Sequence, residues 1–188
     1  MDKKLIILGM GNTLLGDDGV GIYVVQELRN RCSAVEGIDF EYVSWGGFRI
    51  IDVLQNYKNA IVIDAINTNE KPEGYIHVLS HEELLHSIRM VSFHDVNFAT
   101  AIEFASMLNI PMPNKIFVYG IEVRNIETFT EGLTPTAQKA ADECIGMVMK
   151  RIESITLTPN PLSFRRGEAC SPQHLVRRTP MEEGVGSE

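Results

Sequence analysis

Two adjacent carboxylates, Asp17 and Asp18, lie in a glycine-rich segment that directly follows an apolar run at residues 5–8. The five glycines of residues 9–21 invite a phosphate-loop interpretation, but their spacing contradicts it. The third glycine of G-x-G-x-x-G would have to stand at Leu14, and no Lys-Ser/Thr pair follows, as a Walker loop requires. A tight loop that presents two acids suits a cation better than a phosphate. The spacing therefore disfavours a nucleotide-binding protein.

For Asp17 alone, a structural role is the favoured interpretation. A helix is predicted to begin near Gly19, and an aspartate just before a helix is a good N-cap. Neighbouring side chains diverge, so Asp17 could cap the helix while Asp18 faces a cleft. A role for Asp17 as a base is a weaker alternative.

Asp64 directly follows the apolar run Ile61-Val62-Ile63. A carboxylate at the carboxyl end of a central strand is well placed for function, because ligand sites of parallel sheets form at that edge. Asp64 could equally be a turn residue that serves Asn67 and Thr68. The sequence leaves these two interpretations even.

His94 precedes a predicted helix in an otherwise apolar segment, and a lone histidine in such a place is more often structural. Together with two carboxylates, however, it would complete a mixed oxygen and nitrogen set that suits Zn, Ni or Fe(II) with open positions. His81 and His86 are five residues apart, whereas H-E-x-x-H requires four, so they form no zincin motif. No G-x-S-x-G motif occurs.

The elements that must position these residues alternate along the chain. Apolar runs predict strands near residues 5–8, 40–43, 60–63, 75–79 and 115–121. Helical spacing predicts helices near 19–31, 48–57, 95–108 and 135–152, and a short helix that Ser80 would cap. This alternation predicts an α/β fold, a three-layer sandwich in which helices flank both faces of a twisted, mostly parallel sheet of about five strands. Residues 9–21 and 64–69 should then meet at the carboxyl edge of the sheet.

Composition limits the classes of function. The chain has 188 residues, 44% of them hydrophobic, and a net charge of −8, which makes nucleic acid or an anionic membrane a poor partner. Its apolar runs are shorter than the roughly 20 residues of a membrane span, and no signal peptide is recognisable, so a cytoplasmic location is expected. Three distant cysteines predict no disulfide framework. Residues 1–154 are predicted to form one domain, and the proline-containing residues 155–188 a flexible tail.

The segment Gly9-x-Gly11-Asn12-x-Leu14-x-x-Asp17-Asp18-Gly19-x-Gly21 resembles the N-terminal signature of the hydrogenase maturation proteases. These endopeptidases trim the C-terminus of the large subunit of NiFe hydrogenases. The resemblance continues through residues 46–47, 63–65, His94 and 132–135, and it covers roughly residues 4–152. By motif position, it implies that Asp18, Asp64 and His94 are the metal-binding and catalytic residues.

The resemblance also implies the reaction. The chain would be an endopeptidase that removes the C-terminal peptide of a large-subunit precursor after nickel insertion, with the bound nickel as the recognition element. Nickel would arrive with the substrate, and another divalent metal could occupy the site in vitro. The alternative is a non-catalytic metal-binding or chaperone-type maturation factor on the same fold. The oligomeric state is left open by the sequence.

Overall fold

Five strands form one sheet in the computed structural model, which describes residues 3–32, 35–44, 48–80, 83, 98–124, 126 and 129–156. The strands are β1 (Lys3–Met10), β2 (Ile38–Val43), β3 (Tyr57–Ile66), β4 (Ile76–Ser80) and β5 (Lys115–Glu122). Their order across the sheet is β2-β1-β3-β5-β4. Every neighbouring pair is parallel except β4 and β5, which are antiparallel. The prediction of a mostly parallel sheet is confirmed.

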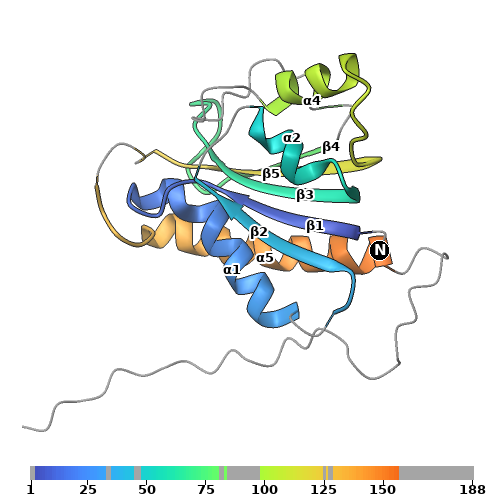
Figure 1. The fold of residues 1–188 in the computed structure, drawn as a ribbon. Helices are drawn as coiled ribbons and strands as arrows, with labels where there is room; N and C mark the ends of the chain where they lie inside the picture. The colour runs from blue at the N-terminus through green and yellow to red at the C-terminus, as the bar shows by residue number, and fades with distance from the viewer. Residues whose placement is uncertain are drawn as a thin grey trace, which may run out of the picture.

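Helices cover both faces of this sheet (Figure 1). A short 3₁₀ turn, η1 (Gly16–Gly19), leads into α1 (Val20–Cys32), and α1 lies with α5 (Pro135–Thr156) on one face. The opposite face carries α2 (Arg49–Leu54) and α4 (Phe98–Met107). No helix in these described ranges is long and apolar enough to cross a membrane.

Alternating side chains divide the core into two halves, because successive residues of a strand point to opposite faces. Leu5 and Ile7 of β1 pack under α1 and α5, whereas Ile6 and Leu8 pack under α2 and α4. Strand β3 follows the same rule, so its central residues are buried on both sides. Continuous apolar runs were therefore a correct sign of central strands.

Several elements differ from their predicted bounds, most clearly β3, α2 and α5. Strand β3 begins at Tyr57, which the sequence placed in a helix, and α2 ends at Leu54. The Tyr57 hydroxyl donates a hydrogen bond of 2.6 Å to Asp39 of β2, and its ring is buried under α2 and α4. Helix α5 runs to Thr156, past the predicted end near residue 152, and Ile155 packs against the core.

Ser80 forms the predicted cap. Its Oγ accepts a hydrogen bond of 3.4 Å from the N–H of Glu83, and its own N–H donates a hydrogen bond of 2.8 Å to the Glu83 carboxylate, as in a capping box. The rest of that predicted helix lies outside the described residues, as do the Gly46-Gly47 pair, residues 95–97 and the tail beyond Thr156.

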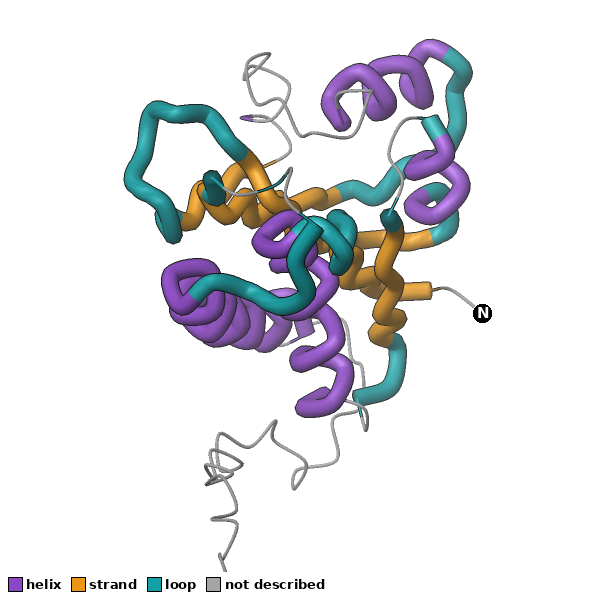
Figure 2. The backbone as a smooth tube through the Cα atoms, turned by 90° about the vertical axis from the view of Figure 1, so that its left-hand side faces the viewer, coloured by secondary structure: helices purple, strands orange, loops and turns teal. Residues whose placement is uncertain are grey.

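The carboxyl ends of the parallel strands meet at one edge of the sheet, which Figure 2 shows facing the viewer. The loops after β1, β3 and β5 gather there. This edge is therefore the place to look for the side chains singled out from the sequence.

Candidate active site

The loop after β1 folds tightly against the start of α1 because two glycines leave room for it. A Cβ on Gly11 would collide with the carbonyl oxygen of Asp18, and Gly11 has a φ of 138°, which disfavours other residues. A Cβ on Gly21 would collide with the carbonyl oxygens of Met10 and Ile63. The glycines thus bring η1 directly over the ends of β1 and β3.

Asp18 lies in η1 and is only 3% exposed. The backbone N–H of Asn12 donates a hydrogen bond of 2.7 Å to its Oδ2. Asn12 also shapes the loop, since its side-chain oxygen accepts a hydrogen bond of 3.0 Å from the N–H of Leu14. The carboxylate of Asp18 is therefore oriented by the loop that carries it.

Asp64 lies within β3, two residues before the strand ends at Ile66, rather than after the strand as the sequence suggested. It is 4% exposed, and the alternation of β3 places its side chain on the face covered by α2 and α4. Burial raises the pKa of Asp64 well above its ordinary value, and the negative charge of Asp18 raises it further. A hydrogen bond from the N–H of Ala65 lowers it in part. The structure thus brings Asp18 and Asp64 together, and the functional role of Asp64 stays a prediction.

Asp17 does not cap α1, and that interpretation was wrong. Both of its oxygens bind Thr134: Oδ1 accepts from the backbone N–H at 2.7 Å, and Oδ2 accepts from the hydroxyl at 2.9 Å. The Thr134 hydroxyl in turn accepts a hydrogen bond of 3.2 Å from the N–H of Ala137 in the first turn of α5. Asp17 therefore anchors η1 to the start of α5, on the opposite side of the sheet from α4.

His94 lies outside the described residues, so its role as a ligand stays a prediction. Within the described ranges, no three His, Cys, Asp or Glu side chains are grouped so that they could hold a metal ion. Helix α4 begins at Phe98, four residues after His94, and it covers the face toward which Asp64 points. Because α4 leads into the amino end of β5, its first turn lies toward the carboxyl edge (Figure 1).

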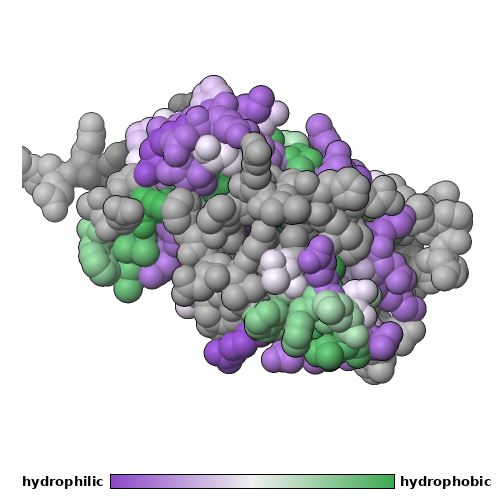
Figure 3. All heavy atoms as spheres, turned by 90° about the horizontal axis from the view of Figure 1, so that it is seen from above, coloured by the Kyte–Doolittle hydropathy of each residue, from purple (hydrophilic) through white to green (hydrophobic). Residues whose placement is uncertain are grey.

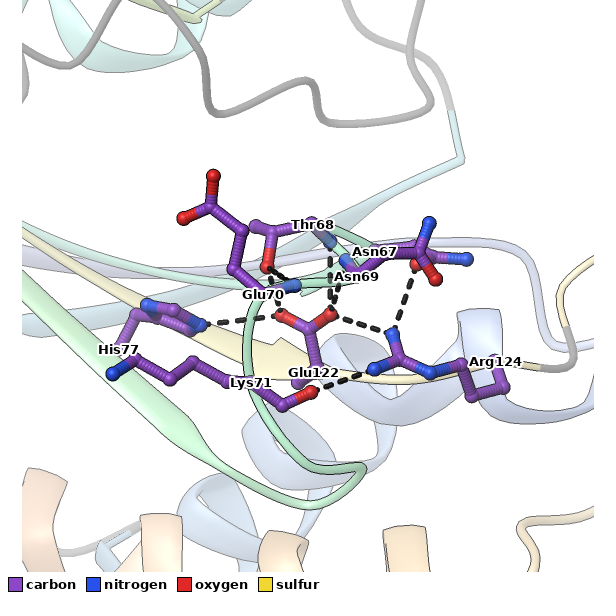
Figure 4. A network of polar contacts seen from close by, with 8 residues as sticks. All are labelled: Asn67, Thr68, Asn69, Glu70, Lys71, His77, Glu122 and Arg124. Atoms are coloured by element: carbon purple, nitrogen blue, oxygen red, sulfur yellow. Dashed lines mark hydrogen bonds and ion pairs between the residues drawn. The ribbon is translucent and has the colours of Figure 1, made fainter.

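Glu122, a buried acid at the same edge, was missed from the sequence. It follows the apolar end of β5, much as Asp64 follows Ile63, and that parallel was the available signal. Figure 4 shows it at the centre of a network with the loop after β3, His77 and Arg124. Its carboxylate accepts hydrogen bonds from Thr68 Oγ1 at 2.9 Å and from Arg124 at 2.6 Å.

The two buried acids differ in what they can do. Burial opposes the charge of Glu122, but hydrogen bonds from Arg124, Thr68 and Asn69 outweigh it and lower the pKa of its carboxyl. These groups stabilise the ionised carboxylate of Glu122, and its oxygens already accept their hydrogen bonds. Asp64 experiences the reverse, since its charged form is disfavoured by burial and by Asp18. A cation would therefore stabilise the ionised form of Asp64 and would add little to Glu122, whose charge is already stabilised.

The described cysteines offer no nucleophile. Cys32 and Cys144 are both buried and form no disulfide, in agreement with their predicted core positions. Burial, together with the nearby charge of Glu143, raises the pKa of Cys144 to about 12. A thiol with that pKa carries almost no thiolate at neutral pH.

Residues 22–151 match the family model described as hydrogenase maturation protease. The hydrogenase 2 maturation protease of Escherichia coli is 24% identical over 147 residues, which cover 78% of this chain and 88% of that protein.

Solved structures agree on the fold. The hydrogenase maturating endopeptidase HybD from E. coli superposes with a TM-score of 0.69 at 21% identity, covering 80% of this chain and 93% of that one. The NiFe hydrogenase maturation protease HybD from Thermococcus kodakarensis gives a TM-score of 0.59 at 21% identity, covering 79% and 98%. The matched model spans most of the chain, including α1 from Ile22 onward, every strand after β1, and α5 up to Arg151. The chain therefore belongs to the hydrogenase maturation protease family and is a peptidase.

Proposed function

We propose that this peptidase removes the C-terminal peptide of a NiFe hydrogenase large-subunit precursor after nickel insertion, and that it recognises the precursor by its nickel. The observation that supports this most directly is the buried pair of Asp18 and Asp64 at the carboxyl edge of the sheet. The pair occurs in a chain whose family and relatives are maturation proteases.

The chemistry of this pair fits a divalent cation. Burial and the nearby charge of Asp18 raise the pKa of Asp64, so this pair binds a cation better than it binds a neutral or anionic group. With His94 they form the mixed oxygen and nitrogen set that suits nickel or zinc with positions left open. A metal ion held there supplies a Lewis acid that polarises the scissile carbonyl.

Recognition through nickel follows from the same electrostatics. In the free enzyme, burial and mutual repulsion disfavour two ionised carboxylates, so a substrate that brings positive charge gains most from the site. A nickel-loaded precursor brings that charge to the site, and a nickel-free precursor does not. The enzyme would thereby act only on precursors that have received their metal.

The test is to incubate the purified protein with a nickel-loaded large-subunit precursor and to follow release of the C-terminal peptide by mass spectrometry. The wild type should release it, and Asp18→Asn and Asp64→Asn should each lower kcat/KM at least about 100-fold. Asp52→Asn, an exposed aspartate on α2, is the matched control and should cleave normally. Stable binding of the precursor without any cleavage would instead support the non-catalytic, chaperone-type alternative.

A further inference from the structure

A second chain segment forms one side of the candidate site. Residues 129–134 run beside the loop that carries Asp17 and Asp18, and Leu15 and Thr130 form a parallel β-bridge. The N–H of Gly16 donates to the carbonyl of Thr130 at 2.8 Å, and the N–H of Thr130 donates to the carbonyl of Leu14 at 3.1 Å. The two segments are thus joined by backbone hydrogen bonds immediately next to η1.

This pairing presents two large apolar side chains to solvent. Leu14 is 54% exposed and Phe129 is 81% exposed. The N–H of Thr130, the residue after Phe129, donates to the carbonyl of Leu14, so the two exposed residues adjoin the same backbone contact. Leu14 and Phe129 are called the apolar rim below.

The rim is held at both ends before any ligand binds. The backbone hydrogen bonds fix one end, and the hydrogen bonds from Thr134 to Asp17 fix the other. A surface that is already ordered loses little conformational freedom on binding, which favours affinity. Exposed aromatic side chains in such a place are typical of protein contact sites.

A second exposed apolar surface lies elsewhere, over α2 and α4. There Phe48 packs on Phe104 with ring centroids 4.7 Å apart, and Met107 and Leu108 are exposed. Figure 3 shows green apolar surface on this side of the molecule and again at the left-hand end, where the carboxyl edge lies. Met107 ends α4 at the amino edge, away from the site, and Leu108 follows it.

We propose that the apolar rim binds an apolar side chain of the precursor segment that flanks the scissile bond. The proposal rests on the proposed function. Leu14 is four residues from Asp18 on the same loop, so the two lie at most about 14 Å apart. An extended polypeptide bound at Asp18 can span that distance within a few residues of its scissile bond. The rim then acts as a specificity element, whereas the carboxylates hold the metal.

The experiment compares matched pairs of exposed apolar residues. The rim variant carries Leu14→Ala and Phe129→Ala, and the control variant carries Leu108→Ala and Met107→Ala, whose exposures are 54% and 80%. Binding to an immobilised nickel-loaded precursor and kcat/KM for peptide release are measured for both variants and for the wild type. Melting temperatures confirm that all three proteins are folded.

The rim variant should bind the precursor at least tenfold more weakly and should lose kcat/KM by the same factor or more, whereas the control should match the wild type. A tenfold change is about 1.4 kcal/mol, which is within what one buried apolar side chain contributes. Wild-type cleavage with no loss in the rim variant, or an equal loss in the control, would overturn the rim proposal and leave the proposed function standing. Rim-dependent binding without cleavage would overturn the proposed function, and with it the assignment of the rim to a segment beside a scissile bond. If the wild type neither bound nor cleaved, both would be overturned.

Discussion

Asp17 and Asp18 are neighbours in the chain, yet they belong to different parts of the site. Asp17 is fully buried and both of its oxygens bind Thr134. Asp18 is oriented by the N–H of Asn12 and lies close enough to Asp64 to raise its pKa. One aspartate therefore holds the loop in place, and the other presents negative charge to the site.

Replacing Asp17 by Asn should weaken the attachment of α5. Asn keeps one acceptor oxygen for the N–H of Thr134 but offers an N–H₂ group where the hydroxyl now donates. We expect a stability loss of about 1–2 kcal/mol, seen as a lower melting temperature, with nickel affinity nearly unchanged. Asp18→Asn should instead lower the nickel affinity and leave the melting temperature nearly unchanged. Loss of nickel binding in Asp17→Asn at an unchanged melting temperature would make Asp17 a ligand and contradict this division.

Asp64→Asn should stabilise the metal-free protein at neutral pH. Because the pKa of Asp64 is raised in the folded state, its carboxyl lowers the stability of the fold as the pH rises above the unfolded-state pKa. Below the unfolded-state value of about 3.9 the carboxyl is protonated in both states, so the gain from Asn should shrink as the pH falls and disappear there. Urea unfolding in the presence of chelator, at pH 7 and pH 4, measures this difference. A variant that is less stable than the wild type at pH 7 would refute the explanation.

Residue types and spacing marked Asp18 and Asp64 as candidates, because both stand next to apolar runs that end at the same edge, whereas the family resemblance was needed to select them. Their catalytic and metal-binding roles stay predictions. The partner of Asp17 could not be found in this way, since Thr134 is 117 residues away. A rule based on neighbouring residues therefore assigned Asp17 to α1, whereas its side chain binds the residue that precedes α5. The Glu122 network was equally hidden, because its members come from the loop after β3, from β4 and from the end of β5.

At the scale of elements, Glu122 joins the loop after β3 to the end of β5. The backbone N–H groups of Thr68 and Asn69 bind one oxygen of Glu122 at 2.9 and 3.0 Å. His77 Nε2 of β4 lies 3.2 Å from the other oxygen, and Arg124 also donates to the carbonyl of Lys71 at 2.6 Å. The antiparallel edge strand is thereby fixed to the parallel part of the sheet.

Glu122→Gln should destabilise the protein by about 2 kcal/mol, because it replaces charge-assisted hydrogen bonds by neutral ones. Glu103→Gln, at an exposed position on α4, is the control and should change little. Since the pKa of Glu122 is lowered, its contribution is present above the unfolded-state pKa near 4.3 and is lost as the pH falls through the folded value. The gap between wild type and variant in urea unfolding should therefore close in acid. A stability difference between wild type and variant that grew as the pH fell would contradict a lowered pKa of Glu122.

The sequence predicted the number and type of the described strands better than their ends. Apolar runs mark the buried centre of β3, but its first residues, Tyr57 to Asn59, are not a continuous apolar run. They are extended because Lys3 of β1 pairs with Tyr57, a contact between distant segments. Periodicity within one segment contains no information about such a pairing.

At the scale of the whole molecule, the two helix layers on opposite faces of the sheet both contribute to the candidate site. The layer of α1 and α5 fixes Asp17, and the other layer, with α2 and α4, covers the face that Asp64 points to. Loops at the carboxyl edge connect these layers. This arrangement explains how a single α/β unit can hold two acidic groups close together in a buried place.

Truncation should separate this folded unit from the tail. Removing residues 157–188 should leave the melting temperature nearly unchanged, as their composition predicts. Removing Ile155 and Thr156 as well should lower it, because Ile155 packs on the core and the Thr156 hydroxyl donates to the carbonyl of Ile152 at 2.9 Å. Calorimetry of both truncated chains checks this. A drop of several degrees in the longer chain would show that the tail contributes to the fold.

The proposal that the precursor's nickel is the recognition element has one direct test. The purified protein is stripped with chelator and then given, in separate reactions, the nickel-loaded and the nickel-free large-subunit precursor, and the released C-terminal peptide is quantified. We expect cleavage of the loaded precursor and none of the nickel-free one, since Asp18 and Asp64 gain a cation only from the former. Efficient cleavage of the nickel-free precursor by the metal-free protein would contradict the account.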